Sequence, residues 1–192
     1  MIKHLSISGL LLLLAATAPL ASDFSEGDNY TIVKVGLIGS GSVDIDGVEI
    51  DHSTGYSLGL GYDFPAGERG HYGFSVDLHR MKWSGETEHF DGQDAETLLD
   101  IGLTWKYILI MSEDRFAVRP GLGVGFGTVR RRQALNGTNY LTLKLYSEFI
   151  YSTSGTVGFL IEVGGFYTPT GGDSETSIRI GPLPYLRAGV LF

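Results

Sequence analysis

Three side chains that together could perform hydrolysis occupy alternate positions of one segment: Ser75, Asp77 and His79. A serine nucleophile, a histidine base and a carboxylate that orients the base form the hydrolytic triad. The segment alternates apolar and polar residues, which predicts a β-strand, and residues two apart on a strand lie about 7 Å apart. Because a nucleophile must contact its base directly, this spacing does not by itself assemble a hydrolase.

Acidic residues gather in a second segment, at Asp44, Asp46, Glu49 and Asp51. The Asp-x-Asp-Gly portion is similar to the start of a calcium-binding loop, but the later ligand positions do not match. Asp46-Gly47 is also a favoured two-residue hairpin turn, in which both residues adopt positive φ. We therefore interpret the acids as a solvated face and expect neither a metal nor a cofactor.

Turn signals divide the chain into strands that position these residues. They are Asp46-Gly47, Asp91-Gly92, Asn136-Gly137 and Gly171-Gly172, each between runs that alternate apolar and polar residues. Of two residues that face each other across a two-residue turn, one has an odd number and the other an even number. The apolar residues should therefore change from odd to even numbers, or from even to odd, at each turn. They do so at all four, which predicts eight antiparallel strands.

The second face of these strands separates a membrane barrel from a soluble β-sandwich. On this face the turns place large residues opposite glycines: Lys34 opposite Gly59, Glu148 opposite Gly125, Tyr146 opposite Gly127, Glu162 opposite Gly181 and Arg179 opposite Gly164. A solvated face does not need such pairing, but the narrow interior of a barrel of about eight strands does. Aromatic residues near the strand ends, among them Trp83, Tyr140 and Tyr167, suit two membrane interfaces. The predicted fold is all-β, an eight-stranded antiparallel up-and-down transmembrane β-barrel with strands projecting beyond the membrane.

Strand parity assigns charged side chains of both signs to the barrel lumen. They are Lys34, Asp63, Asp77, Asp100, Lys106, Arg119, Lys144, Glu148, Glu162, Arg179 and Arg187. The second turn places Asp77 opposite Lys106, so we expect these two side chains to pair. Interior ions persist only when they are paired and hydrogen-bonded. We therefore expect a side-chain-filled polar lumen, with a small-solute channel as the alternative.

Residues 1–22 have the pattern of a secretory signal peptide, with Lys3, an apolar run and small residues before Ser22. Residues 23–192 then form the barrel domain. Without Lys3, 13 basic residues stand against 22 acidic ones, a net charge of −9, which argues against a nucleic-acid partner. The absence of cysteine excludes disulfides and thiolate metal sites.

The last predicted strand, residues 185–192, places apolar residues at alternate positions and ends on Phe192. With the strand pattern, it makes the mature chain resemble the small eight-stranded outer-membrane β-barrel proteins of Gram-negative bacteria, of the OmpX and OmpA transmembrane-domain kind. The resemblance implies a bacterial outer-membrane location, both termini in the periplasm, and recognition of Phe192 by the barrel-assembly machinery. It also implies a structural role or adhesion to a host or surface ligand.

The sequence gives less support to two other functions of such barrels, an apolar conduit and a lipid-modifying enzyme. An apolar conduit of the OmpW kind would need apolar inward residues, which the parity does not supply. The lipid-modifying PagL-type deacylases carry a late-strand His-x-Ser-Asn motif, whereas this chain has no histidine after His89. We therefore expect no enzymatic activity.

Two outer surfaces follow from strand length and parity. A first strand of residues 30–45 would be taller than the roughly 25 Å lipid band, so its end should project. There, an apolar face is predicted to contact a partner: Val43, Ile45, Val48 and Ile50. Basic residues of lipid-facing parity are predicted to bind lipopolysaccharide phosphates: Arg80, Lys82, Arg130 and Arg132. Pro120, Pro182 and Pro184 lie within predicted strands, although proline lacks a ladder donor. Pro182 and Pro184 share a face and predict a bulge in the last strand.

Overall fold

The computed structural model describes residues 29–192 except 88–89, 93–94, 113–114, 131–137, 154–156 and 173–175. Within the described strands, the side chains of residues 86–87, 90–92, 95, 110–112 and 130 are not described. The predicted signal peptide and Arg132 lie outside the described residues. Among the residues described, no helix is long and apolar enough to cross a membrane.

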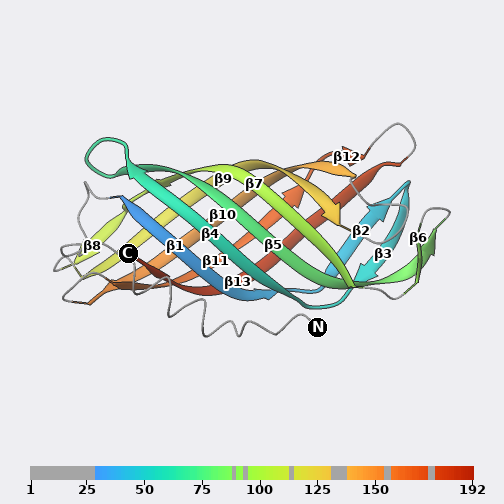
Figure 1. Cartoon of the computed structure of the whole chain (residues 1–192), viewed down its shortest axis with the longest axis horizontal. Helices are drawn as coiled ribbons and strands as arrows, with labels where there is room; N and C mark the ends of the chain where they lie inside the picture. The colour runs from blue at the N-terminus through green and yellow to red at the C-terminus, as the bar shows by residue number, and fades with distance from the viewer. Residues whose placement is uncertain are drawn as a thin grey trace, which may run out of the picture.

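The described chain consists of β-strands. They are β1 (Tyr30–Ile38), β2 (Gly41–Ile45), β3 (Val48–His52), β4 (Gly55–Pro65), β5 (Gly70–Thr87), β6 (Phe90–Gly92), β7 (Ala95–Tyr107), β8 (Ile110–Ser112), β9 (Phe116–Arg130), β10 (Asn139–Ser152), β11 (Gly158–Thr168), β12 (Gly171–Gly172) and β13 (Ile178–Leu191). The order β1-β4-β5-β7-β9-β10-β11-β13 closes on itself through antiparallel pairing of β13 with β1 (Figure 1). The predicted eight-stranded antiparallel barrel is confirmed.

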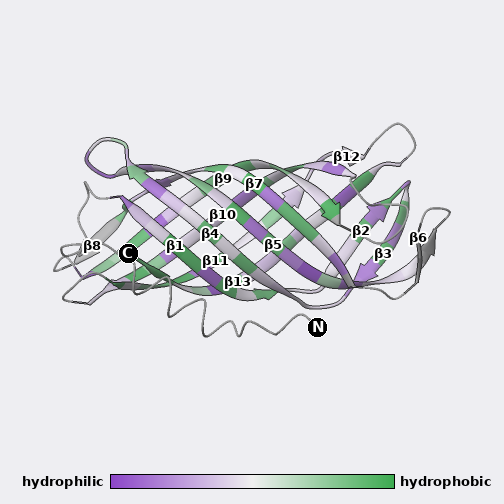
Figure 2. Ribbon diagram, in the orientation of Figure 1, coloured by the Kyte–Doolittle hydropathy of each residue, from purple (hydrophilic) through white to green (hydrophobic). Residues whose placement is uncertain are grey.

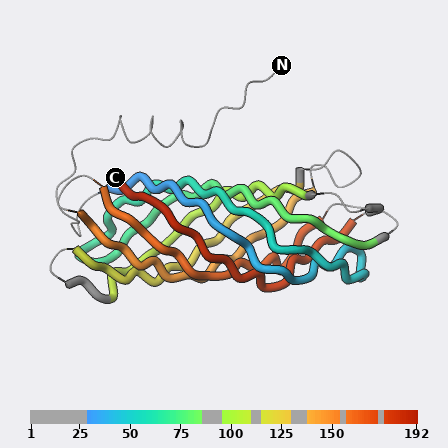
Figure 3. Tube along the Cα trace, turned by 90° about the horizontal axis from the view of Figure 1, so that it is seen from below, coloured from blue at the N-terminus to red at the C-terminus, as the bar shows by residue number. Residues whose placement is uncertain are grey.

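The strands run obliquely around the barrel, as the trace in Figure 3 shows. Strands β2 and β3 form a hairpin at the end opposite the C-terminus, between β5 and β13 (Figure 1). We call this the hairpin end and the other the termini end. Short strands β6, β8 and β12 extend the pairing of β5, β9 and β10.

The first hairpin has the predicted turn and register. Asp46 and Gly47 both have positive φ, of 55° and 80°, and the Gly47 amide donates a 3.1 Å hydrogen bond to the Asp44 carboxylate. Lys34 pairs with Gly59, as the turn predicts. This prediction is confirmed because a type I′ turn fixes the register of the strands it joins.

The registers predicted from the other turn signals are wrong by six residues. Asp77 pairs with Asp100 rather than Lys106, Glu148 with Arg119 rather than Gly125, and Glu162 with Arg187 rather than Gly181. Asp91-Gly92 lies in β6 and Gly171-Gly172 forms β12, so both are strand residues. Asn136-Gly137 lies outside the described residues. Side chains alternate between the two faces of a strand with a period of two, so a register shift of six residues leaves the predicted inward and outward faces unchanged.

The last strand changes face where a bulge was predicted. The partners of β11 skip from Leu183 to Ile180 on β13. Buried positions accordingly change from the odd numbers Leu183 and Tyr185 to the even numbers Ile178 and Ile180. The prediction for Arg179 is therefore wrong, because Arg179 is exposed outside the barrel, where it pairs with Asp44 on β2.

A second change of face lies between β1 and β2 and between β3 and β4. In β1, which ends at Ile38, the inward-facing residues have even numbers, whereas in β2 they have odd numbers. Val43, Ile45 and Ile50 therefore point inward and are buried, whereas Val48 lies at the rim and is 45% exposed. The predicted outward apolar face is wrong. Its parity was extrapolated from β1 across the irregular residues 39–40, where the face inverts.

Candidate functional site in the barrel lumen

The interior of the barrel is divided into three layers along its axis. A small apolar layer fills the termini end: Tyr30, Ile32, Ile108, Ala117, Ile150, Leu160 and Leu191. Charged side chains fill the middle. A larger apolar layer fills the hairpin end: Ile38, Val43, Ile45, Ile50, Met81, Trp83, Leu98, Val129, Tyr140, Tyr146, Phe166, Ile178, Ile180, Leu183 and Tyr185.

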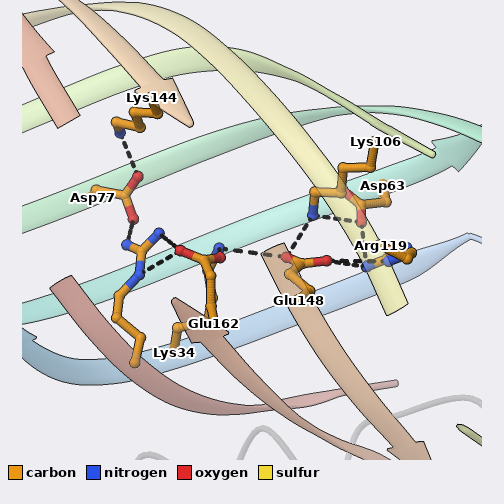
Figure 4. A network of polar contacts seen from close by, with 9 residues as sticks. Lys34, Asp63, Asp77, Lys106, Arg119, Lys144, Glu148 and Glu162 are labelled. Atoms are coloured by element: carbon orange, nitrogen blue, oxygen red, sulfur yellow. Dashed lines mark hydrogen bonds and ion pairs between the residues drawn. The ribbon is translucent and has the colours of Figure 1, made fainter. Parts of the chain in front are cut away.

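Glu148 is the hub of one half of the charged layer. One of its oxygens accepts a 3.0 Å hydrogen bond from Lys106 and the other accepts a 2.7 Å bond from the Arg119 guanidinium. Asp63 accepts from the same two cations, at 2.8 and 3.1 Å. These four side chains form a closed group of two cations and two carboxylates (Figure 4).

Glu162 and Asp77 organise the other half. Lys34 donates to Glu162 at 2.6 Å and lies 3.9 Å from Glu148, which connects the two halves. Arg187 contacts Glu162 through two nitrogens and Asp77 through a third. Lys144 closes the chain with a 2.6 Å bond to Asp77 (Figure 4). Nine buried side chains therefore form one continuous network across the lumen.

Asp100 brings the charges of this layer into balance. It accepts a 2.6 Å hydrogen bond from Thr142, and His79 Nε2 lies 3.3 Å from its other oxygen. His79 in turn stacks on Phe166, with ring centroids 4.9 Å apart, at the border of the hairpin-end apolar layer. With Asp100 included, five carboxylates face five cations in this layer. Glu96, which pairs with Met81 nearer the hairpin end, is a sixth buried carboxylate of the described interior.

The structure places ten of the eleven predicted lumenal charges inside the barrel, with Arg179 as the exception. The predicted contact between Asp77 and Lys106 is wrong. Lys106 binds Asp63 and Glu148, while Asp77 binds Lys144 and Arg187. The partners differ because the register of β5 with β7 differs by six residues from the one predicted.

Tyrosines of the hairpin-end apolar layer border the charged layer, and glycines give them room. The ammonium groups of Lys34 and Lys106 lie 5.8 and 5.9 Å from the centre of the Tyr146 ring. A Cβ on Gly121 would lie 2.7 Å from that ring, and one on Gly127 would lie 2.2 Å from the Tyr140 ring. Large residues thus lie opposite glycines in β9 and β10, as expected, but in other combinations.

The three residues with hydrolytic potential have other roles or none. Ser75, Asp77 and His79 are all buried. Asp77 is bound by two cations and His79 faces Asp100, while no hydrogen bond to the Ser75 hydroxyl is found among the described residues. The arrangement therefore lacks the contact between nucleophile and base that hydrolysis needs.

The hairpin-end apolar layer was missed from the sequence. We expected no apolar inward residues of the kind that a conduit needs, and this expectation is wrong for this end. Trp83 and Tyr140 were assigned to an aromatic girdle but are buried in this layer, whereas Tyr167 is exposed. The signal that could have found the layer is the polarity of the residues that alternate with Met81 and Trp83, namely Arg80, Lys82 and Ser84.

The residues predicted to bind lipopolysaccharide lie where the outer wall changes from apolar to polar. Leu78 is exposed, and Arg80 and Lys82 follow it on the same outward face. Arg80 pairs with Tyr56 on one side, and Tyr56 is 70% exposed. On the other side, the backbone of Thr97 separates Arg80 from Arg130. The side chain of Arg130 and all of Arg132 lie outside the described part.

An exposed apolar wall around a charge-filled interior defines this chain as a transmembrane β-barrel. Outward-facing residues such as Leu60, Phe74 and Leu103 are about half exposed, and Figure 2 shows apolar and polar residues alternating along the strands. Residues 8–180 match the model of the outer membrane protein beta-barrel domain, so the chain belongs to that family. Its place is therefore the bacterial outer membrane.

Solved structures support the same fold. The crystal structure of the outer membrane protein OprG from Pseudomonas aeruginosa superposes with a TM-score of 0.60 at 14% identity, covering 90% of this chain and 99% of OprG. The crystal structure of Neisserial surface protein A gives a TM-score of 0.54 at 15% identity, covering 85% of this chain and 95% of that protein. No significant match was found among curated proteins.

Proposed function

We propose that this protein is a non-enzymatic outer-membrane barrel with a closed lumen. The barrel holds the β2–β3 hairpin beyond the membrane and places a basic collar, formed by Arg80 and Lys82, against the outer leaflet. The observation that carries the proposal is the continuous network from Lys144 to Asp63. It crosses the lumen, and its side chains are buried. Solutes could pass only if these contacts opened.

The cost of opening supports a closed state. Removing one partner from a buried ion pair costs about 3–5 kcal/mol, because the remaining charge is left without compensation. Glu148 binds both Lys106 and Arg119, and Glu162 binds both Lys34 and Arg187. A continuous water path would require several of these contacts to separate at once.

The orientation proposed has both termini in the periplasm and the hairpin end outside, with Phe192 available to the barrel-assembly machinery. The Arg80 and Lys82 collar would then lie at the height of lipopolysaccharide phosphates, which a guanidinium can bind with two hydrogen bonds. The adjacent exposed Tyr56 suits an interfacial position. An external ligand of the β2–β3 hairpin would meet the exposed acids Glu49 and Asp51.

Planar-bilayer recordings of the refolded protein test the closed lumen. We expect no reproducible conductance steps from the wild type. Steps in the wild type that grow in Glu148→Ala or Arg187→Ala, and not in the exposed control Glu49→Ala, would contradict the proposal.

A small-solute channel is the second candidate, favoured by the apolar layer at the hairpin end. The fifteen side chains of that layer could line a path for apolar solutes if the layer loosened. Uptake of an apolar and a polar solute of equal size into protein-containing vesicles separates the two functions. A closed barrel passes neither, whereas selective uptake of the apolar solute would favour the channel.

Lipopolysaccharide binding is tested by the double variant Arg80→Ser/Lys82→Ser. Its thermal stabilisation by added lipopolysaccharide should be smaller than that of the wild type, because two phosphate contacts are lost. The control is Arg115→Ser, an exposed arginine at the termini end. Equal stabilisation of the double variant and the wild type would exclude the contact.

A further inference from the structure

A hollow of about 590 Å³ opens on the outer wall at the termini end. It lies between the β4–β5 turn and β7 and is lined by Ala66, Glu68, Arg69, Gly70, Trp105 and Tyr107. It is separate from the lumen, since Trp105 and Tyr107 belong to the outward face of β7 and are each 39% exposed.

The backbone of the turn builds this hollow. The Ala66 amide donates a 2.7 Å hydrogen bond to the Gly70 carbonyl, and the Ile108 amide donates a 2.8 Å bond to the Arg69 carbonyl. The second bond fastens the turn to the end of β7. Gly70 pairs with Tyr107 and places no side chain beside its ring. A Cβ on Gly70 would lie 2.5 Å from the Ala66 carbonyl oxygen, so the close approach requires glycine.

The position of the hollow indicates a ligand at the membrane surface. The rings of Trp105 and Tyr107 stack with centroids 6.3 Å apart, and Tyr72 is exposed beside Trp105 on β5. Tryptophan and tyrosine on the lipid-facing wall of a barrel gather at the height of the headgroups. A molecule in the hollow would therefore have a headgroup at the turn and apolar chains along the wall.

The charges of the hollow select among headgroups. Glu68 and Arg69 are both exposed on its rim and provide one carboxylate and one guanidinium. A guanidinium matches a phosphate, which it can bind with two hydrogen bonds. A carboxylate matches an ammonium group that can donate hydrogen bonds to it. A headgroup that satisfies both must be zwitterionic with a protonated amine.

We propose that this hollow binds the phosphoethanolamine headgroup of a phospholipid in the adjacent leaflet. Arg69 contacts the phosphate, Glu68 accepts hydrogen bonds from the ammonium group, and Trp105 and Tyr107 pack against the glycerol and the first methylenes. Phosphatidylglycerol lacks the ammonium group and is repelled by Glu68. Phosphatidylcholine carries three methyl groups in place of the donors. The proposal depends on the barrel spanning a membrane and not on the state of the lumen.

Native mass spectrometry of the full refolded chain tests this selectivity. The protein is held in detergent with an equimolar mixture of phosphatidylethanolamine, phosphatidylglycerol and phosphatidylcholine that share the same acyl chains. We expect wild-type protein to retain phosphatidylethanolamine roughly two- to fivefold over each of the others, the range that one exposed ion pair provides.

Variants assign the two charges. Glu68→Gln should abolish the preference over phosphatidylglycerol. Arg69→Gln should reduce retention of all three lipids, because each carries a phosphate. Arg115→Gln, an exposed arginine at the same end but outside the hollow, should behave as wild type. Equal retention of the three lipids by wild type would mean unselective lipid contact and would overturn the proposal. Unchanged selectivity in both hollow variants would overturn it as well.

Discussion

The middle of the barrel and its hairpin end hide opposite kinds of side chain behind the same wall of strands. In the middle, the interior is charged and the outer face is apolar, as at Asp77 beside Val76 and Leu78. At the hairpin end the interior is mainly apolar, with Glu96 and His52 as buried exceptions, and the outer face is polar. Met81 and Trp83 lie inside there, between the outward-facing Arg80, Lys82 and Ser84.

The surroundings of each region explain this difference. Lipid favours apolar side chains on the outer face, so the middle of the barrel must bury its polar ones and pair them. A sheet that projects into water buries its apolar face instead. The strands achieve the inversion in two ways. In β5 the odd-numbered residues face inward throughout, and only their type changes from polar to apolar. In β13, and between β1 and β2, an irregularity in the backbone changes which residues, odd-numbered or even-numbered, face inward.

The largest effect should follow from removing the hub of the charged region. Glu148→Ala leaves Lys106 and Arg119 in the interior with less compensation and should lower the free energy of unfolding by about 3–5 kcal/mol. Urea titration of the barrel refolded in lipid vesicles measures this. Glu49→Ala, in the exposed hairpin, should change it little. Similar values for the two variants would show that the network does not stabilise the fold.

The apolar region should respond to a cavity. Ile45→Ala removes a fully buried side chain and should cost about 2–4 kcal/mol. Val48→Ala, its partner across the turn, should cost much less because nearly half of Val48 is exposed. The same titration compares them. If Ile45→Ala were as mild as Val48→Ala, the inward orientation of β2 would be wrong.

A third substitution tests the register of β9 with β10 at the border between the charged region and the apolar region. Gly127→Ala would place a methyl group against the Tyr140 ring and Asp100, and we expect a loss of about 1–3 kcal/mol. Gly123 on the same strand and face has its nearest neighbours at 3.4 Å, so Gly123→Ala should be milder. Equal stability of the two variants would indicate that β9 and β10 pair in another register.

The smallest effect concerns pH at the hairpin end. Burial lowers the pKa of His52 below its ordinary value, against the smaller opposing influences of the Ser53 carbonyl and Asp51. The unfolded chain therefore takes up a proton at higher pH than the folded chain. Stability should fall as the pH decreases through about 6.5 toward the lower folded pKa. His52→Gln should flatten this slope between pH 7.5 and 5.5, and an unchanged slope would exclude His52 as its source.

Local chemistry was sufficient to predict much of this fold. Alternation of residue types gave the eight strands and the faces of most of them, and Asp46-Gly47 gave one turn and its register. The lumenal position of ten charges, including Glu148 and Arg187, followed from parity alone. These features depend on neighbours in sequence, since a strand has a period of two and a type I′ turn needs two residues with positive φ.

The partners of those charges were decided by the tertiary structure. A slip of six residues leaves every face intact, so alternation cannot distinguish Lys106 from Asp100 as the neighbour of Asp77. The choice depends on how side chains from distant strands fill one narrow lumen, such as Tyr146 over Gly121. The inversion at the hairpin end was decided in the same way. Which face of Ile45 or Arg179 is hidden depends on where the lipid ends, and that boundary is set by the assembled barrel and not by any single strand.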